Sequence, residues 1–409
     1  MVEQHGKTLV PQIRFAGFTD PWEQRKLGEL YKEVSEKNDL TYGRDRIISV
    51  AHMYFNPVVY VTEDDYLKTY NVMRLGDIAF EGNRSKNFAH GRLVENTIGD
   101  GIVSHVFKVF RPIQPFDLMY WKYSINNEKA MKDVLTRSTK ASTMMHELVA
   151  KDFLNEEIAV PSLEEQRRIG AFFDRLDSLI TLHQRKYDKL CVLKKSMLDK
   201  MFPKGGSLYP EIRFAGFTDP WEQRKLGDIL QERNVRTSDF ESNPIFSLTI
   251  EDGITPKTDR YERTSLITKT EDLFKIVSPN EFVTNPMNLR FGAFGYNKNS
   301  FSVCVSGYYD VFSIDNDKCS GFWNSYFKTS VALKRFDDAA TGSLIEKRRV
   351  KYSTLCQLIF LMPKGMDEKK RIGAFFDRLD SLITLHQRKY CGVVSWMLGV
   401  ALVRLSSEK

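Results

Sequence analysis

A short polar segment in the first half of the chain carries residue types suited to contacting nucleic acid. It runs from Glu81 to Arg92 (EGNRSKNFAHGR), and its glycines and asparagines predict a turn-rich loop between strands. Arginine can donate two hydrogen bonds to guanine, asparagine can bond adenine similarly, and lysine neutralises phosphate. For any single residue the alternative is a solvated loop position. The candidate contacts are Asn83, Arg84, Lys86, Asn87, His90 and Arg92.

Further polar and basic clusters offer the same chemistry elsewhere. Arg137, Ser138 and Lys140 form a second patch in the first half, although 136–143 could equally be a polar loop leading into the next helix. The second half has a positional counterpart of the first loop and a separate basic cluster. Its candidates are Asn285, Asn288, Arg290, Tyr296, Asn297, Lys298, Asn299, Lys347, Arg348 and Arg349.

Catalytic and metal-binding signatures do not emerge from the sequence. A DNA methyltransferase needs a glycine-rich donor loop and an Asn/Asp-Pro-Pro-aromatic motif, and the nearest string, NPMN from Asn285, lacks the second proline and the aromatic. We find no carboxylate cluster typical of a metal-dependent nuclease. The five cysteines form no Cys-x-x-Cys pair, and His183 and His386 have no second ligand one turn away, so packing is the favoured role of both histidines. We expect no catalytic residue and no metal in this chain.

Two repeated blocks position these candidates. Residues 11–28 recur at 210–227 with one change, Gln12 to Glu211, and residues 168–187 recur letter for letter at 371–390. The inserts between the blocks, about 29–167 and 228–370, differ in sequence. This pattern favours one scaffold carrying two distinct readers, although a tandem duplication with faster-changing surface loops would look the same.

The second block has the apolar spacing of a long helix with a coiled-coil seam. Pro203, Gly205 and Gly206 predict its end, and after Tyr390 the second copy departs from the first. An isolated amphipathic helix of this length would expose its stripe, so we expect the two copies to pack together about a pseudo-twofold axis. The expected pairing residues are Ile169, Phe173, Leu176, Ile180 and Tyr187 with Ile372, Phe376, Leu379, Ile383 and Tyr390.

The inserts are predicted to be compact mixed α+β domains. The runs 102–110 and 301–314 are rich in strand formers, 127–135 is helical in pattern, and Trp22 and Trp221 are expected as core anchors. The predicted division is 1–167 and 204–370 for two recognition domains, with 168–203 and 371–409 as helical spacers. A length of 409 residues supports several domains, and a formal charge of +7 is compatible with a polyanionic partner without requiring one. The absence of an apolar leader or span, together with the cysteine usage, favours the cytoplasm.

Three motifs together carry a family resemblance. They are F-x-G-F-x-x-x-W-x-x-x-x-L-G opening each half, LEEQRRIGAFFDRLD from Leu163, and RLGDIAF from Arg74. The chain resembles the specificity subunits of type I restriction-modification enzymes, those of Gram-positive bacteria in particular, over nearly its whole length. Two departures stand out: Lys369 replaces the Gln166 of the first half, and an uncharged stretch from Cys391 replaces a lysine-rich one.

The resemblance implies an α+β protein with two target recognition domains separated by two long antiparallel helices. Each domain would read one half of a bipartite, asymmetric site on double-stranded DNA, in defence against foreign DNA. Two modification (methyltransferase) subunits would dock on the helices, and restriction (nuclease-translocase) subunits would join them. S-adenosylmethionine, magnesium ions and ATP would belong to these partners, leaving this chain non-catalytic and without a cofactor. The rival hypothesis is a protein–protein scaffold whose inserts bind proteins and whose coiled coil dimerises two chains.

Overall fold

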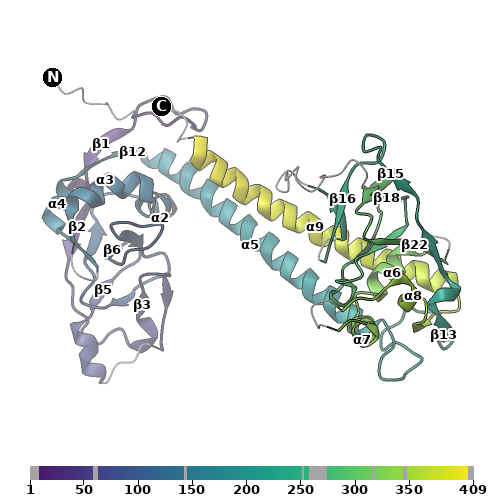
Figure 1. Cartoon of the computed structure of the whole chain (residues 1–409). Helices are drawn as coiled ribbons and strands as arrows, with labels where there is room; N and C mark the ends of the chain where they lie inside the picture. Colours follow the sequence, from purple (N-terminus) through teal and green to yellow (C-terminus); the bar gives the residue numbers. More distant parts are fainter. Residues whose placement is uncertain are drawn as a thin grey trace. The chain divides into compact units, whose positions relative to one another are not determined.

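The computed structural model describes residues 9–58, 63–141, 145–250, 253–257, 274–315, 318–343 and 348–403. The chain divides into two compact units: unit 1 comprises Met1–Thr181 with Val393–Lys409, and unit 2 comprises Leu182–Gly392. Two long helices, α5 (Leu163–Lys200) and α9 (Met366–Val403), each contribute residues to both units (Figure 1). Over the described residues no helix is both long and apolar enough to cross a bilayer.

Unit 1 is built on a four-stranded antiparallel sheet in the order β2-β9-β6-β7, and smaller strand pairs surround it. The sheet strands are β2 (Tyr31–Val34), β9 (Val109–Pro112), β6 (Ile78–Glu81) and β7 (Arg92–Glu95). The pairs are β1 (Glu23–Lys26) with β12 (Glu157–Val160), β3 (Ile48–Ser49) with β4 (Tyr54–Phe55), β5 (Asn71–Met73) with β8 (Gly101–Val103), and β10 (Thr139–Ala141) with β11 (His146–Leu148).

Short helices cover one face of this sheet, and side-chain caps mark the start of two of them. They are α1 (Leu27–Leu30), α2 (Leu118–Ile125), α3 (Glu128–Ser138) and α4 (Ala150–Asn155). The Asp117 carboxylate accepts the N–H of Tyr120 at the start of α2, and the Asn127 side chain accepts two backbone N–H groups at the start of α3. The predicted helix at 127–135 is therefore confirmed as α3.

Unit 2 repeats this topology with different residues. Its sheet has the order β14-β22-β19-β20, which matches β2-β9-β6-β7, so the internal repeat extends through inserts of unlike sequence. The predicted strand-rich runs 102–110 and 301–314 each contain two strands separated by a turn. The strands are β13 (Glu222–Lys225), β14 (Leu230–Arg233), β15 (Arg236–Thr237), β16 (Phe246–Thr249), β17 (Gly253–Pro256), β18 (Phe274–Val277), β19 (Phe282–Thr284), β20 (Phe294–Tyr296), β21 (Val303–Val305), β22 (Asp310–Ile314) and β23 (Ile359–Met362). The short helices are α6 (Ser320–Tyr326), α7 (Ser330–Ala339) and α8 (Tyr352–Leu355).

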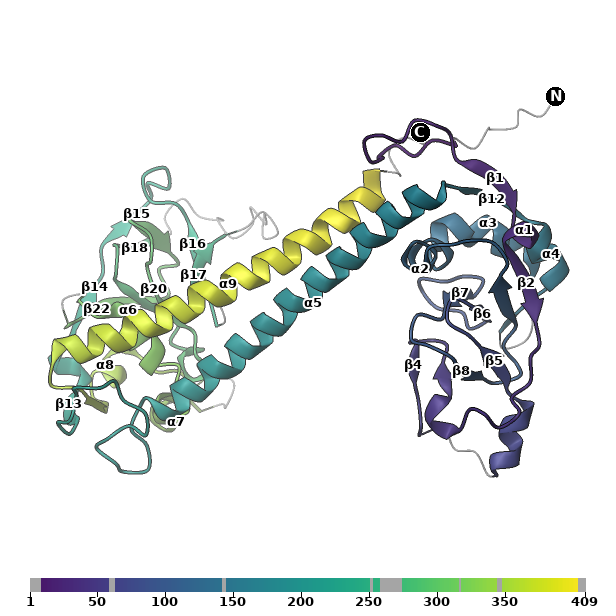
Figure 2. The ribbon, with the colours of Figure 1, turned by 180° about the vertical axis from the view of Figure 1, so that it is seen from behind.

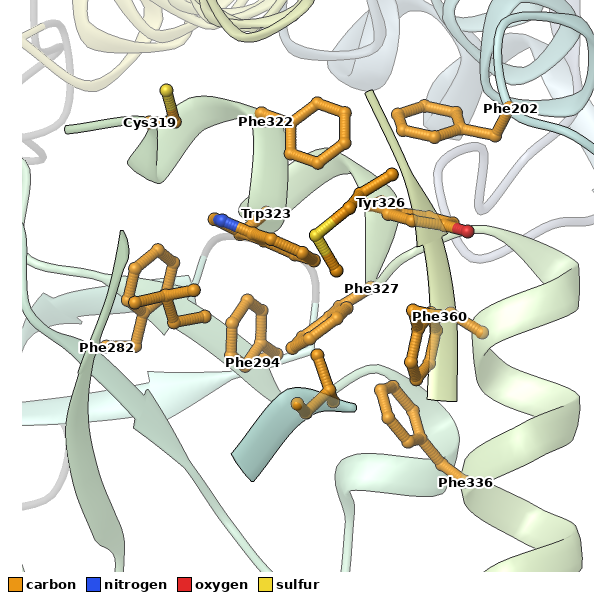
Figure 3. Close-up of a cluster of buried hydrophobic side chains, with 14 of the residues drawn as sticks. Phe202, Phe282, Phe294, Cys319, Phe322, Trp323, Tyr326, Phe327, Phe336 and Phe360 are labelled. Atoms are coloured by element: carbon orange, nitrogen blue, oxygen red, sulfur yellow. The ribbon is translucent and has the colours of Figure 1, made fainter. Parts of the chain in front are cut away.

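The core of unit 2 is strongly aromatic (Figure 3). Phe202, just beyond the end of α5, stacks on Tyr326 of α6 with ring centroids 4.7 Å apart and contacts Phe376 of α9 at 5.9 Å. Trp221 is 1% exposed in the same cluster, which confirms it as a core anchor. Its counterpart Trp22 is only half-buried. The end of α5 is thus fastened to the globular part of unit 2 by ring packing.

Within unit 2, α5 and α9 lie side by side and run antiparallel (Figures 1 and 2). The His183 and His386 Nδ1 atoms are 3.0 Å apart, and Lys194 Nζ lies 2.5 Å from Asp380 Oδ1. As the residue number rises on one helix it falls on the other, which confirms the predicted antiparallel pairing. The rings of His183 and His386 are 5.3 Å apart, and no group of three or more potential metal ligands occurs among the residues described here.

The residues expected to pair the helices also pack against the globular parts. Ile372, Phe376 and Leu379 are buried in the core of unit 2 together with apolar residues of α5, and Ile169 packs against the core of unit 1. Helix α5 begins at Leu163, earlier than the repeated block, because the Ser162 hydroxyl accepts the N–H of Glu165. The other expected pairing residues are half-buried: Phe173, Leu176, Ile180, Tyr187, Ile383 and Tyr390.

Candidate nucleic-acid interface

The polar segment of the first half is the loop of a β-hairpin. Strands β6 and β7 pair from Ile78↔Glu95 to Glu81↔Arg92, so residues 82–91 connect them, as predicted. The backbone N–H groups of Asn87 and Phe88 are both bonded to the Ser85 hydroxyl, which shapes the turn. Four predicted contact residues are exposed on this loop and free to meet a ligand from solvent: Asn83, Arg84, Lys86 and Asn87.

The side chain of Arg92, at the end of this loop, has three internal partners. Its guanidinium lies 2.6 Å from the Glu81 carboxylate, donates a hydrogen bond of 2.5 Å to the Ala51 carbonyl, and is 5.1 Å from the centre of the Phe88 ring. Ala51 belongs to the turn between β3 and β4. The guanidinium of Arg92 is therefore committed to internal partners that join two hairpins of unit 1, and its contact with DNA stays a prediction.

A third hairpin, β10–β11, reaches the same loop. The His146 N–H donates to the Gly82 carbonyl at 2.9 Å, and the rings of His90 and His146 are 5.1 Å apart. A Cβ atom at Gly82 would lie 2.1 Å from the His146 carbonyl oxygen, so this approach requires glycine. Burial, Arg84 and His90 together lower the pKa of His146. Residues of the loop thus lower the pKa of a histidine on the neighbouring hairpin.

The second predicted patch of unit 1 separates into two parts. Lys140 is exposed on β10 and shares the hairpin that meets the loop. Arg137 instead ends α3, where its guanidinium makes three hydrogen bonds to the Glu156 carboxylate, and Ser138 is buried with its hydroxyl donating to the Val134 carbonyl. Of this patch, only Lys140 is therefore exposed on the hairpin that contacts the loop.

In unit 2 the corresponding loop, residues 285–293, joins β19 to β20. Arg290 on this loop lies 3.1 Å from the Asp337 carboxylate of α7, and Arg348 approaches the same oxygen at 3.7 Å while donating to the Asp337 and Ala340 carbonyls. The two basic clusters predicted separately are thus brought together at Asp337. Asn288 and Arg349 are exposed, Asn285 is half-buried, and Lys347 lies outside the described residues.

Four predicted contacts of unit 2 lie at the opposite end of β20 and have internal partners: Tyr296, Asn297, Lys298 and Asn299. Asn297 is 1% exposed and donates to the Val277 and Phe301 carbonyls, while its own oxygen accepts two hydrogen bonds from Asn299. The Tyr296 hydroxyl donates to the Asp377 carboxylate of α9, and Lys298 Nζ lies 3.0 Å from it. Burial, then Asp377, raises the pKa of Tyr296. Tyr296 and Lys298 thus hold the sheet to the long helix.

Sequence reasoning missed exposed residues on the neighbouring hairpins. His52 and Tyr54 flank the β3–β4 turn, which Arg92 ties to the loop of unit 1, and Tyr54 is 47% exposed. Phe291 and Ile250 of unit 2 are 54% and 42% exposed. The signal available in the sequence for Phe291 is an aromatic residue directly before a glycine, Gly292.

Glu95, on the same strand as Arg92, supports a pH-dependent prediction. It is 2% exposed, and its pKa is raised to about 9, chiefly by burial, with Asp117 adding to the effect and Lys122 opposing it. The folded chain therefore keeps this proton while the unfolded chain loses it near pH 4.5, so the free energy of unfolding falls as pH rises from about 4.5 to 9. We expect Glu95→Gln to raise the free energy of unfolding by about 2 kcal/mol at pH 8 and to change it little at pH 4.5.

Thermal unfolding of both proteins at the two pH values checks this expectation. Glu147→Gln, which removes an exposed carboxylate on β11, is the matched control and should leave the melting temperature unchanged at either pH. An equal effect of Glu95→Gln at both pH values would contradict a proton held on Glu95.

Comparison with known proteins agrees with this arrangement. The family described as the type I restriction modification DNA specificity domain matches residues 19–191. The type I restriction enzyme MjaVIII specificity subunit of Methanocaldococcus jannaschii is 25% identical over 255 residues, which cover 57% of this chain and 55% of that protein's length. Residues 19–191 are thus similar to the type I restriction modification DNA specificity domain, and the chain spans about half the length of the specificity subunit that it matches.

Solved structures bear on the fold alone. The S subunit of a type I restriction-modification system from M. genitalium has a TM-score of 0.51 at 11% identity, covering 97% of this chain and 98% of that one. The HsdS subunit from Thermoanaerobacter tengcongensis covers 94% of this chain and 97% of its own at 17% identity, with a TM-score of 0.45. The first of these likenesses extends the shared architecture, two β-rich domains and paired long helices, over the whole chain.

Proposed function

We propose that this chain selects the DNA sequence on which a type I restriction-modification complex acts. One observation carries the proposal: two units of the same topology present the same hairpin loop with unlike residues, 82–91 in unit 1 and 285–293 in unit 2. Polar and basic side chains on such loops can contact base edges and phosphates. Since the loops differ, each unit would read its own half of a bipartite, asymmetric site.

In this proposal the chemistry belongs to partner subunits. Two modification subunits dock along α5 and α9, restriction subunits join the complex, and S-adenosylmethionine, magnesium ions and ATP are bound by these partners. The chain itself supplies recognition, with residues 1–167 and 204–370 as target recognition domains and 168–203 and 371–409 as helical spacers. Whether the divergent segment from Cys391 onward supports such docking is testable by co-expression with the modification subunit.

Exchanging one insert tests the proposal. Residues 29–167 are replaced by the insert of a relative with a known target, the chain is assembled with its modification subunits, and the methylated sites are sequenced. One half of the methylated sequence should change and the other half should persist, because only one reader has been altered. The reciprocal exchange of residues 228–370 is the matched control and should change the other half.

A change in both halves, or in neither, would contradict the assignment of one half-site to each unit. The rival protein–protein scaffold predicts no methylated site that follows the insert at all. Footprinting the intact complex on its target separates the hypotheses again: two protected patches are expected of a DNA reader, and none of a scaffold that folds normally.

A further inference from the structure

The two hairpin loops expose opposite kinds of surface. In unit 1 the exposed positions of the loop are polar apart from Ala89, and the aromatic residue of the loop, Phe88, is half-buried. In unit 2 the loop instead exposes Phe291, 54% of whose surface is accessible, while Asn288 is the exposed polar residue. A single exposed apolar side chain is ordinary on a protein surface. The contacts that Phe291 and its neighbours make distinguish it from such a side chain.

The ring of Phe291 packs against the guanidinium group of Arg290, which is itself held in an ion pair. The Arg290 guanidinium lies 4.4 Å from the centre of the Phe291 ring and 3.1 Å from the Asp337 carboxylate, which also receives Arg348. Leu289, which directly precedes Arg290, is completely buried and anchors the turn. The ring of Phe291 thus has one charged packing partner, and 54% of the side chain stays exposed.

The backbone at Gly292 brings this loop close to a second exposed apolar residue on the neighbouring hairpin. Gly292 has φ +95°, a left-handed conformation that glycine adopts without strain, and this turns the chain sharply after Phe291. A Cβ built on Gly292 would lie 3.8 Å from the methyl group of Ile250, whose side chain is 42% exposed at the β16–β17 turn. Ile250 therefore lies beside Gly292, the residue that follows Phe291, and the side chains of Phe291 and Ile250 are both exposed.

We propose that Phe291 reads the methyl group of a thymine in the half-site contacted by unit 2, an inference that rests on the proposed function. In the major groove the C5 methyl is the apolar feature that distinguishes thymine from other bases, and side chains such as phenylalanine contact it. Arg290 and Arg348 share the one carboxylate of Asp337, so net positive charge remains near this contact to attract phosphates. Unit 1 then recognises its half-site with hydrogen-bonding groups and unit 2 recognises part of its half-site with an apolar one.

Deoxyuridine provides the probe, because uracil pairs as thymine does and lacks only the methyl group. Once the methylated site is known, each thymine assigned to unit 2 is replaced singly by deoxyuridine in a duplex, and affinity for the full chain assembled with its modification subunits is measured. One replacement should weaken binding about fourfold, the effect of removing one CH₂-sized group from an apolar contact. The complex carrying Phe291→Ala should bind thymine and deoxyuridine duplexes equally.

Phe301→Ala is the matched control. Phe301 is 49% exposed in the same unit but lies in the connection from β20 to β21, away from the 285–293 loop. That variant should keep the fourfold preference for thymine. Circular dichroism of both variants checks that each one folds as the parent does.

Three results would overturn the inference. One is a unit 2 half-site without thymine, and another is a deoxyuridine effect that persists in Phe291→Ala. The third is a uniform loss of affinity for all sequences in that variant, the behaviour of an aromatic wedge that unstacks a base step. Failure of the proposed function looks different, since the parent complex would then select no site and both proposals would fall together.

Discussion

Replacing Phe202 by alanine is expected to lower the free energy of unfolding of unit 2 by about 3–5 kcal/mol. The Phe202 side chain is 2% exposed, and its ring packs against those of Tyr326, Phe376 and Trp221 at 4.7, 5.9 and 6.1 Å. Alanine would leave a cavity where the end of α5 joins the core. This loss would come from packing alone, because phenylalanine carries no polar group.

Denaturant unfolding followed by tryptophan fluorescence measures this effect, since Trp221 and Trp323 belong to the same core. Val192→Ala is the matched control: Val192 lies on the same helix, is 70% exposed, and should change stability by less than about 0.5 kcal/mol. A loss for Phe202→Ala as small as that of the control would mean that the end of α5 is not held by the aromatic core.

Lys369→Gln is expected to cost about 3–5 kcal/mol, although glutamine is the residue at the matching place in the first half. Lys369 is 5% exposed, and its Nζ lies 2.7 Å from the Asp315 carboxylate, which also accepts the indole N–H of Trp323. Removing the ammonium group would leave a buried carboxylate without its counter-charge. In the first half, Gln166 instead donates to the Pro161 carbonyl and accepts the N–H of Asp117.

A double-mutant cycle isolates the ion pair. Lys369→Gln combined with Asp315→Asn removes both charges, retains the hydrogen-bonding groups, and should recover much of the stability lost by the single variant. Lys370→Gln, at the exposed neighbouring position, is the matched control and should be nearly neutral. If the double variant were as unstable as Lys369→Gln, the cost would arise from packing of the lysine stem rather than from the unpaired carboxylate.

Much of the architecture was predictable from the sequence because its repeats are long and nearly identical. The blocks at 11–28 and 168–187 predicted two equivalent halves, and the apolar period of the second block predicted paired helices. The glycine-rich segment near Asn83 was recognisable as a loop. Helix α5 begins earlier than its repeated block because of the Ser162 and Glu165 cap, which the apolar period alone could not reveal.

The roles of individual polar residues were far less predictable. Arg92, Asn297 and Tyr296 are of the types that contact bases, yet in the fold their partners are Glu81, two backbone carbonyls and Asp377. Some of those partners are distant in sequence, Asp377 above all. Composition alone therefore cannot distinguish a residue with internal partners from one that contacts DNA. Phe291, which no sequence pattern singled out, is exposed in the fold.

The carboxylate of Asp337 serves two arginines that arise far apart along the chain, Arg290 and Arg348. An exchange at any of these three positions alters the electrostatic environment of the other two. Among relatives, the three positions should therefore covary. A redesign of the 285–293 loop that removed Arg290 and kept Asp337 would leave that carboxylate without one of its two counter-charges. Retargeting this half of the molecule consequently calls for coordinated substitution across three segments.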